Sequence, residues 1–257
     1  MDAGNRNVER PLRAAQKNGA KNGPKETVQK EEGDRMSDNV SAFDAAEYDR
    51  KIRQTVPFYD EMVSQAAGLV KTVFHAPVSW LDVGCGTGKM ADTAMKQVKA
   101  ERFVFCDVSE KMLRIARQRF DGPEREFVLR DVREMTFDGE FDVVTSVMVF
   151  HFLQRTDRLE ALGKCFDALR PGGVLISFSN FAPFTETGKT VCLERWGRYQ
   201  TEQGKSPEES RSHIARYGKA YYPLTPFDEI ALLKASGFRT AEILWLSNMQ
   251  IGVWGMK

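Results

Sequence analysis

Short apolar runs alternate with segments of helical spacing between residues 78 and 180. The runs are VSWLDV at 78–83, RFVFCD at 102–107, a run centred on 127–129, FDVVTSV at 141–147 and GGVLISFS at 172–179. Helical segments lie between them, near 89–98, 109–120 and 157–169. Several runs are continuously apolar or β-branched, which is typical of strands covered by helices on both faces. The pattern predicts a doubly wound α/β domain with a mostly parallel sheet.

The segments on either side of this region extend the prediction. Apolar residues recur at helical spacing from 45 to 74, and Pro57 interrupts them, which predicts two short helices. A final helix is expected at 226–235, followed by the strands TAEILWLS and QIGVWGM. Only Asn248 and Met249 separate these strands, so they must pair as an antiparallel hairpin.

The chain is expected to form one folded domain. Residues 1–40 are rich in polar and charged side chains and predict a disordered tail, whereas 41–257 form the domain. Within it, 41–75 supply the N-terminal helices and 181–224 an aromatic-rich insertion that could cover a substrate. In that insertion Ser206, Pro207 and Glu209 make a favourable helix start.

Composition excludes several classes of function. The chain has 257 residues, with 37 Lys and Arg against 36 Asp and Glu, so no overall field attracts nucleic acid or an anionic membrane. Its four cysteines are far apart in the sequence, which argues against a metal site or a disulfide framework and fits a reducing cytoplasm. No apolar run approaches the roughly 20 residues of a membrane span. No oligomer interface can be recognised.

Three glycines follow the first strand directly. Gly84, Gly86 and Gly88 in GCGTG lie in the turn before the next helix, where a ligand could approach the backbone. A tight strand-to-helix turn or a dinucleotide site would also use such glycines. Here the spacing is GxGxG, and Asp82 precedes it, where a carboxylate would repel a pyrophosphate and attract a cation. The pattern favours a cationic nucleoside.

Two more acids end successive strands. Asp107 ends the second strand, where a carboxylate can bind both ribose hydroxyls; it could instead cap the following helix, but Ser109 can also do so. Asp131 follows the third strand and could accept from an adenine amino group while Val132 covers the ring. Open α/β sheets bind ligands along this edge, so the three acids predict one site.

Together, LDVGCGTGKM, FCDVSEKML, LRDV, FDVVTSVMVFHFL and LRPGGVL resemble the class I S-adenosylmethionine (SAM)-dependent methyltransferase family. The resemblance implies a Rossmann-like sheet of seven strands with an antiparallel last strand, and SAM as cofactor. It implies that Asp82, Gly84 and Gly86 meet the methionine part, Asp107 the ribose, and Asp131 with Val132 the adenine. The expected cofactor-binding set is completed by four residues within or beside these motifs: Cys85, Gly88, Val108 and Ser146.

A narrower likeness concerns the two ends of the domain. FDAAEYDRKIRQTVPFYDEM and LWLSNMQIGVWGMK resemble the group that includes the carboxy-SAM synthase of transfer-RNA wobble-uridine modification. This likeness implies that Tyr59 lies near the cofactor and that Arg216 holds the extra carboxylate of carboxy-SAM. The glycine turn here is a conventional GCGTG, unlike that of the synthase, so ordinary methyl transfer is favoured.

The methyl acceptor is expected beyond the cofactor. His151, after the fourth strand, is the candidate general base, although a packing or gating role is slightly favoured over it. Phe150, Trp196 and Arg216 are predicted to contact substrate. The near charge balance of 181–224 favours a small-molecule acceptor over nucleic acid. A carboxy-SAM synthase and a non-catalytic SAM-binding module are the alternatives.

Overall fold

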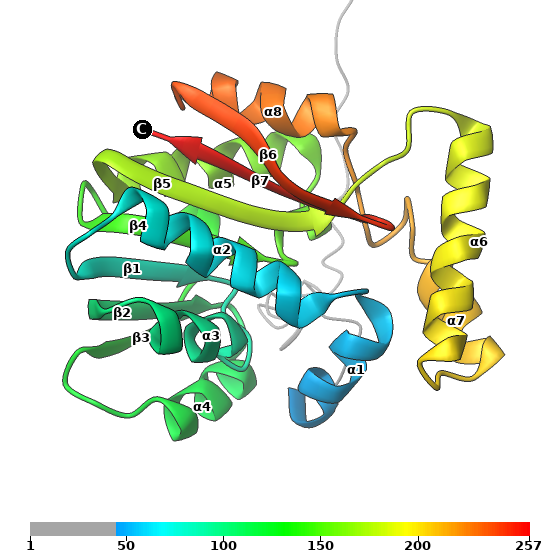
Figure 1. The fold of residues 1–257 in the computed structure, drawn as a ribbon, viewed down its shortest axis with the longest axis horizontal. Helices are drawn as coiled ribbons and strands as arrows, with labels where there is room; N and C mark the ends of the chain where they lie inside the picture. The colour runs from blue at the N-terminus through cyan, green and yellow to red at the C-terminus, as the bar shows by residue number, and fades with distance from the viewer. Residues whose placement is uncertain (1–44) are drawn as a thin grey trace, which may run out of the picture. The chain divides into compact units, whose positions relative to one another are not determined.

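A seven-stranded sheet forms the centre of the computed structural model, which describes residues 45–257 (Figure 1). The strands are β1 (Val78–Val83), β2 (Ala100–Asp107), β3 (Arg125–Leu129), β4 (Phe141–Val147), β5 (Leu169–Asn180), β6 (Thr240–Ser247) and β7 (Gln250–Met256). They lie in the order β3-β2-β1-β4-β5-β7-β6. The first five are parallel, and β7 runs antiparallel to both β5 and β6. The predicted doubly wound sheet and its antiparallel hairpin are confirmed.

Helices cover both faces of the sheet. They are α1 (Tyr48–Thr55), α2 (Tyr59–Val73), α3 (Lys89–Gln97), α4 (Glu110–Arg119), α5 (Arg155–Ala168), α6 (Glu186–Glu202), α7 (Pro207–Ile214) and α8 (Pro226–Ala235), with short 3-10 turns η1 (Ala45–Glu47), η2 (Val132–Glu134) and η3 (Phe150–Phe152). α2, α3 and α4 pack on one face, and α5 and α8 on the other. No helix within 45–257 is long and apolar enough to cross a bilayer.

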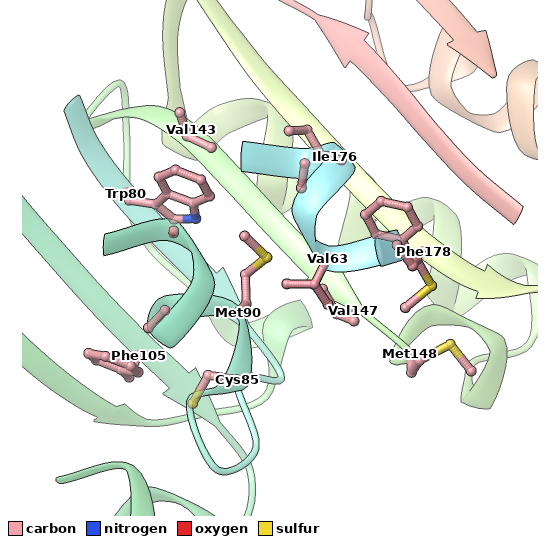
Figure 2. Close-up of a cluster of buried hydrophobic side chains, with 14 of the residues drawn as sticks. Val63, Trp80, Cys85, Met90, Phe105, Val143, Val147, Met148, Ile176 and Phe178 are labelled. Atoms are coloured by element: carbon pink, nitrogen blue, oxygen red, sulfur yellow. The ribbon is translucent and has the colours of Figure 1, made fainter. Parts of the chain in front are cut away.

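Two apolar clusters stabilise these layers. Successive residues of a strand point to opposite faces, so Trp80 joins the first cluster while its neighbour Leu81 joins the second. Figure 2 shows the first cluster, where Val63 of α2 and Met90 of α3 lie over Trp80 and the strands beside it. Each fully buried large side chain contributes about 1.5–3 kcal/mol relative to exposure. The continuously apolar strands therefore supply core side chains to both faces of the sheet.

The ends of the helices follow their local sequence signals. The break at Pro57 separates α1 from α2 as predicted, and Phe58 between them adopts a φ of 54°. At α7, Ser206 and Glu209 form the predicted reciprocal capping box, with bonds of 3.1 and 2.8 Å. The α8 N-terminus is capped by Thr225. These caps satisfy backbone donors that would otherwise lack partners.

α6 and α7 lie beyond one end of the strands, to the right in Figure 1. Side chains of α6 bind main-chain oxygens of α1: Trp196 Nε1 donates to Thr55 O at 2.6 Å and Tyr199 Oη to Arg53 O at 3.0 Å. These bonds hold the inserted helices against α1. The predicted tail at 1–40 and the first residues of the predicted domain lie outside the described residues.

Candidate active site

A cavity of about 110 Å³ opens at the carboxyl ends of four strands. It is lined by residues that follow or end β1, β2, β4 and β5, together with residues of α1, α6 and α7: Tyr48, Ile52, Thr55, Val56, Gly84, Gly86, Asp107, Val108, Met112, Val147, Met148, Val149, His151, Phe152, Asn180, Trp196, His213 and Tyr221. β1 and β4 are neighbours in the sheet. The chain continues outward from β1 to β2 and β3 on one side, and from β4 to β5 on the other, so the cavity lies at the switch point of the sheet.

The glycine turn forms one wall of this cavity. Gly84, Gly86 and Gly88 have φ of 64°, 55° and 83°, a region that other residues rarely adopt. A Cβ on Gly84 would lie 2.3 Å from Val149, and one on Gly88 2.6 Å from Phe120, so neither position has room for a side chain. A Cβ on Gly86 would meet nothing nearer than 4.0 Å. Gly84 and Gly86 line the cavity, whereas Gly88 begins α3 beside it.

Asp107 is fixed by the backbone and faces the same cavity. Its Oδ2 accepts from Gly86 N at 2.8 Å and its Oδ1 from Ser109 N at 2.9 Å. Ser109, not Asp107, caps α4 by accepting from Met112 N. Burial raises the pKa of Asp107, and the backbone hydrogen bonds oppose this rise. Each oxygen keeps acceptor capacity, which suits two ribose hydroxyls.

Asp82 lies behind the glycine turn and is only 1% exposed. Its Oδ1 accepts from the Thr145 hydroxyl at 2.7 Å, and that hydroxyl accepts from Trp80 Nε1 at 2.9 Å. Its Oδ2 has no hydrogen-bond partner within 45–257. Burial raises the pKa of Asp82 to about 7, against the lowering effect of Thr145. Asp82 does not line the cavity, but its unpaired oxygen suits a cationic ligand nearby.

Asp131 is engaged by a neighbouring arginine. Its carboxylate accepts from Arg133 N, Nε and Nη2 at 2.9, 3.0 and 2.7 Å, and these bonds lower the pKa of Asp131. Val132 is buried in the second core cluster. Neither Asp131 nor Val132 lines the cavity. Adenine recognition by this pair stays a prediction, and it would require Asp131 to share its oxygens with Arg133.

Other predicted site residues divide between the cavity and the core. Val108, His151 and Trp196 line the cavity. The structure places four others in the buried interior rather than in the lining: Tyr59, Cys85, Ser146 and Phe150. Their predicted ligand contacts are untested by this placement.

Tyr48 of α1, rather than Tyr59, brings a tyrosine ring to the cavity. Arg216 lines a second cavity, which shares His213 with the first. The Arg216 guanidinium carbon lies 5.0 Å from the centroid of the Tyr221 ring. Arg216 is therefore separated from the main cavity by about one aromatic ring.

A series of aromatic rings forms another part of the cavity lining, called the aromatic wall below. The centroid of the His151 ring lies 4.4 Å from that of Phe152 and 5.3 Å from that of Tyr221. His213 continues the series, 5.4 Å from Tyr221 and 5.2 Å from Trp196. Burial lowers the pKa of His151 well below its ordinary value and that of His213 to about 3. Both imidazoles are therefore neutral at pH 7.

Sequence reasoning missed several lining residues. Asn180 ends β5 and so carries the same signal that identified Asp107, a polar side chain at the carboxyl end of a strand. Met148 and Val149 follow β4, and Met148 has a φ of 61°. His213 reaches the cavity from α7, and no local pattern in the sequence marks it.

The residues present fit SAM. Asp107 offers acceptors for the ribose, the glycine turn leaves backbone exposed to the cavity, and the unpaired Asp82 oxygen lies behind that turn. Within 45–257 no three His, Cys, Asp or Glu side chains are grouped to hold a metal ion.

The chain is similar in sequence to a methyltransferase domain family and to carboxy-SAM synthases. A family described as methyltransferase domain matches residues 81–173. The carboxy-SAM synthase of Nautilia profundicola is 22% identical over 206 residues, covering 79% of this chain and 88% of that protein. The synthase of Campylobacter lari is 24% identical, covering 77% and 85%.

Solved structures show the same fold. A SAM-dependent methyltransferase from Mesorhizobium loti superposes with a TM-score of 0.53 at 17% identity, covering 76% of this chain and 98% of that one. The CurJ carbon methyltransferase gives a TM-score of 0.60 at 14% identity, covering 83% and 61%. With its glycine turn and its backbone-bound acid at the end of β2, the segment 81–173 is a methyltransferase domain in a class I SAM-dependent methyltransferase fold, and SAM is its cofactor.

Proposed function

We propose that the protein transfers the methyl group of SAM to a small-molecule acceptor bound in the main cavity. One observation carries this proposal. The cavity extends from the nucleoside ligands, Gly86 and Asp107, to the aromatic wall of His151, Trp196 and Tyr221. One cavity thus has a cofactor end and an acceptor end.

The protein's contribution to this reaction is chiefly alignment. SAM supplies an activated methyl group, whose bond to sulfur breaks with its electrons staying on sulfur as the acceptor forms the new bond and releases its proton. Correct juxtaposition can lower a barrier by roughly 7–11 kcal/mol, whereas a general base usually adds about 100- to 10,000-fold in rate. α1 and α6, joined by the Trp196 bond, bound the cavity and help to exclude water.

His151 contributes as a neutral hydrogen-bonding group in this proposal. Its ring is 2% exposed and lines the cavity. The lowered pKa makes it a poor resting place for a proton at pH 7, which argues against a strong general base.

Labelled SAM incubated with fractionated metabolites tests the proposed transfer. We expect label to appear in an organic acceptor in proportion to the S-adenosylhomocysteine formed. Asp107→Ala should abolish both signals because it removes the ribose acceptor. Binding of SAM without any labelled acceptor across the fractions would instead support a non-catalytic SAM-binding module.

A carboxy-SAM synthase is the second candidate function. The relatives from Nautilia profundicola and Campylobacter lari carry that name and match most of the folded chain. Arg216, one ring away from the cavity, is a candidate ligand for an added carboxylate. Mass spectrometry of the nucleoside that copurifies with the protein separates the candidates, because carboxy-SAM is heavier than SAM by one carboxylate.

A further inference from the structure

The acceptor end of the main cavity contains no carboxylate among the described lining residues. Asp107 is the only Asp, Glu, Lys or Arg of the described residues in the lining, and it belongs to the cofactor end. Asn180 supplies an amide, and Ile52 and Val56 are apolar. An ammonium group entering this end would lose its hydration without gaining a counter-ion, at a cost of several kcal/mol. The lining therefore disfavours a cationic acceptor.

Positive groups lie behind this wall. Arg158 is fully buried; its Nη2 donates to Tyr222 O at 2.7 Å, and its Nη1 pairs with Glu229. The Arg216 guanidinium lies over the Tyr221 ring, and Arg216 itself is outside the cavity lining. Burial is the main cause of the lowered pKa of His151, and Arg158, His213 and Arg216 lower it further. The two arginines, which stay charged at pH 7, likewise oppose a positively charged ligand beside His151.

The shape of the wall favours a flat molecule. Five rings with consecutive centroid distances of 4.4–5.4 Å line it: His151, Phe152, Tyr221, His213 and Trp196. Aromatic faces and edges pack well against another planar ring, with offset or edge-to-face geometry.

One buried polar atom belongs to a residue of this wall and lacks a partner. His151 Nδ1 is buried and has no hydrogen-bond partner within 45–257. The residue is held in place through its backbone, because His151 O accepts from Tyr222 N at 2.7 Å. A buried polar atom without a partner costs free energy that a ligand's hydroxyl group could recover.

We infer that the methyl acceptor is a planar, hydroxyl-bearing molecule without positive charge, a phenol-like ring whose hydroxyl group bonds to His151 Nδ1. This inference rests on the proposed methyl transfer and specifies its substrate class.

Four matched compounds test the inference on the full chain saturated with S-adenosylhomocysteine. p-Cresol is the expected ligand; toluene lacks its hydroxyl group, 4-methylcyclohexanol lacks its planarity, and 4-methylbenzylamine carries a positive charge. Saturation-transfer NMR and competition give their relative affinities. We expect p-cresol to bind about fivefold more tightly than toluene, the factor given by one neutral hydrogen bond of about 1 kcal/mol. We expect 4-methylbenzylamine to bind more than about tenfold more weakly than p-cresol.

Two identical substitutions assign the hydroxyl preference to one atom. His151→Phe keeps a ring but removes Nδ1, so the preference for p-cresol over toluene should fall to about one. His75→Phe is the matched control, because His75 is exposed and outside the cavity lining. It should leave the preference unchanged.

The possible outcomes separate this inference from the proposed function. If p-cresol binds no better than 4-methylbenzylamine, or His151→Phe retains the hydroxyl preference, the inference is wrong. Calorimetry of S-adenosylhomocysteine alone tests the proposed function independently. Binding of that nucleoside with no discrimination among the four compounds overturns only the acceptor class.

Discussion

The buried ion pair between α5 and α8 predicts a large loss of stability when one partner is removed. Arg158 and Glu229 have side-chain exposures of 0% and 7%, and Arg158 also donates to the main-chain oxygens of Tyr222 and Leu153. Arg158→Gln removes the positive charge and leaves Glu229 buried without it. Breaking a buried pair in this way typically costs about 3–5 kcal/mol of the free energy of unfolding.

The chain contains a matched exposed pair between the same helices. Arg155 of α5 bonds to Asp228 of α8 at 3.0 Å, with side-chain exposures of 53% and 40%. Arg155→Gln is the same substitution one turn earlier, and exposed pairs contribute about 0–1 kcal/mol. The two variants thus differ mainly in the burial of the charges.

Urea denaturation of the wild type and both variants measures the difference. For a domain of this size each kcal/mol shifts the melting temperature by roughly 2–4 °C, so thermal melts should order the variants in the same way. Replacing Arg158 and Glu229 together by Met should restore part of the loss, because no lone charge remains buried. Equal and small losses for Arg158→Gln and Arg155→Gln would refute the reasoning.

Three further predictions follow from the site and the chain. SAM should bind more tightly as the pH rises through about 7, because Asp82 has a raised pKa and only its ionised form attracts the cation. Calorimetry from pH 6 to 8 should show this pH dependence of the affinity, and Asp82→Asn should remove it. Gly88→Ala should destabilise the fold by more than about 2 kcal/mol in denaturant melts, because the position has a positive φ and the new Cβ would clash with Phe120. Gly139→Ala is the control: its φ is also positive but no atom lies within 4 Å, so it should cost only about 1–2 kcal/mol. Because residues 1–40 are predicted to be a disordered tail, a chain that begins at Met36 should keep the melting temperature and transfer rate of the full chain. Loss of either would show that residues 1–35 contribute to the fold or to the reaction.

Much of the fold could be predicted because strand and helix periods are local. β1 and β4 occupy the predicted ranges, and the pairing of β6 with β7 followed from the short connection between them. The first residues of β5 were missed because Arg170 and Pro171 do not resemble an apolar strand. No range could be given for α6, whose apolar residues serve α1 and α7 as well as the cavity.

The candidate site was predictable only where it depends on the local sequence of a strand and the turn after it. Asp107 and Gly86 were identified because the carboxyl ends of parallel strands meet at one edge. The aromatic wall brings His151 together with His213 and Tyr221, which lie more than 60 positions away along the chain, and only the packing of α7 and the segment before α8 makes them neighbours. The engagement of Asp131 by Arg133 also depends on a side-chain conformation that the sequence does not specify.

Calorimetric titration with SAM and with NAD tests whether the glycine turn and Asp107 form a SAM site. We expect SAM and S-adenosylhomocysteine to bind at one site per chain, and NAD not to bind. We also expect Asp107→Asn to weaken SAM binding by roughly 10- to 100-fold, since hydrogen bonds to a charged group contribute about 1.5–3 kcal/mol each. Uptake of NAD by a protein that ignores both SAM and its homocysteine product would contradict this assignment.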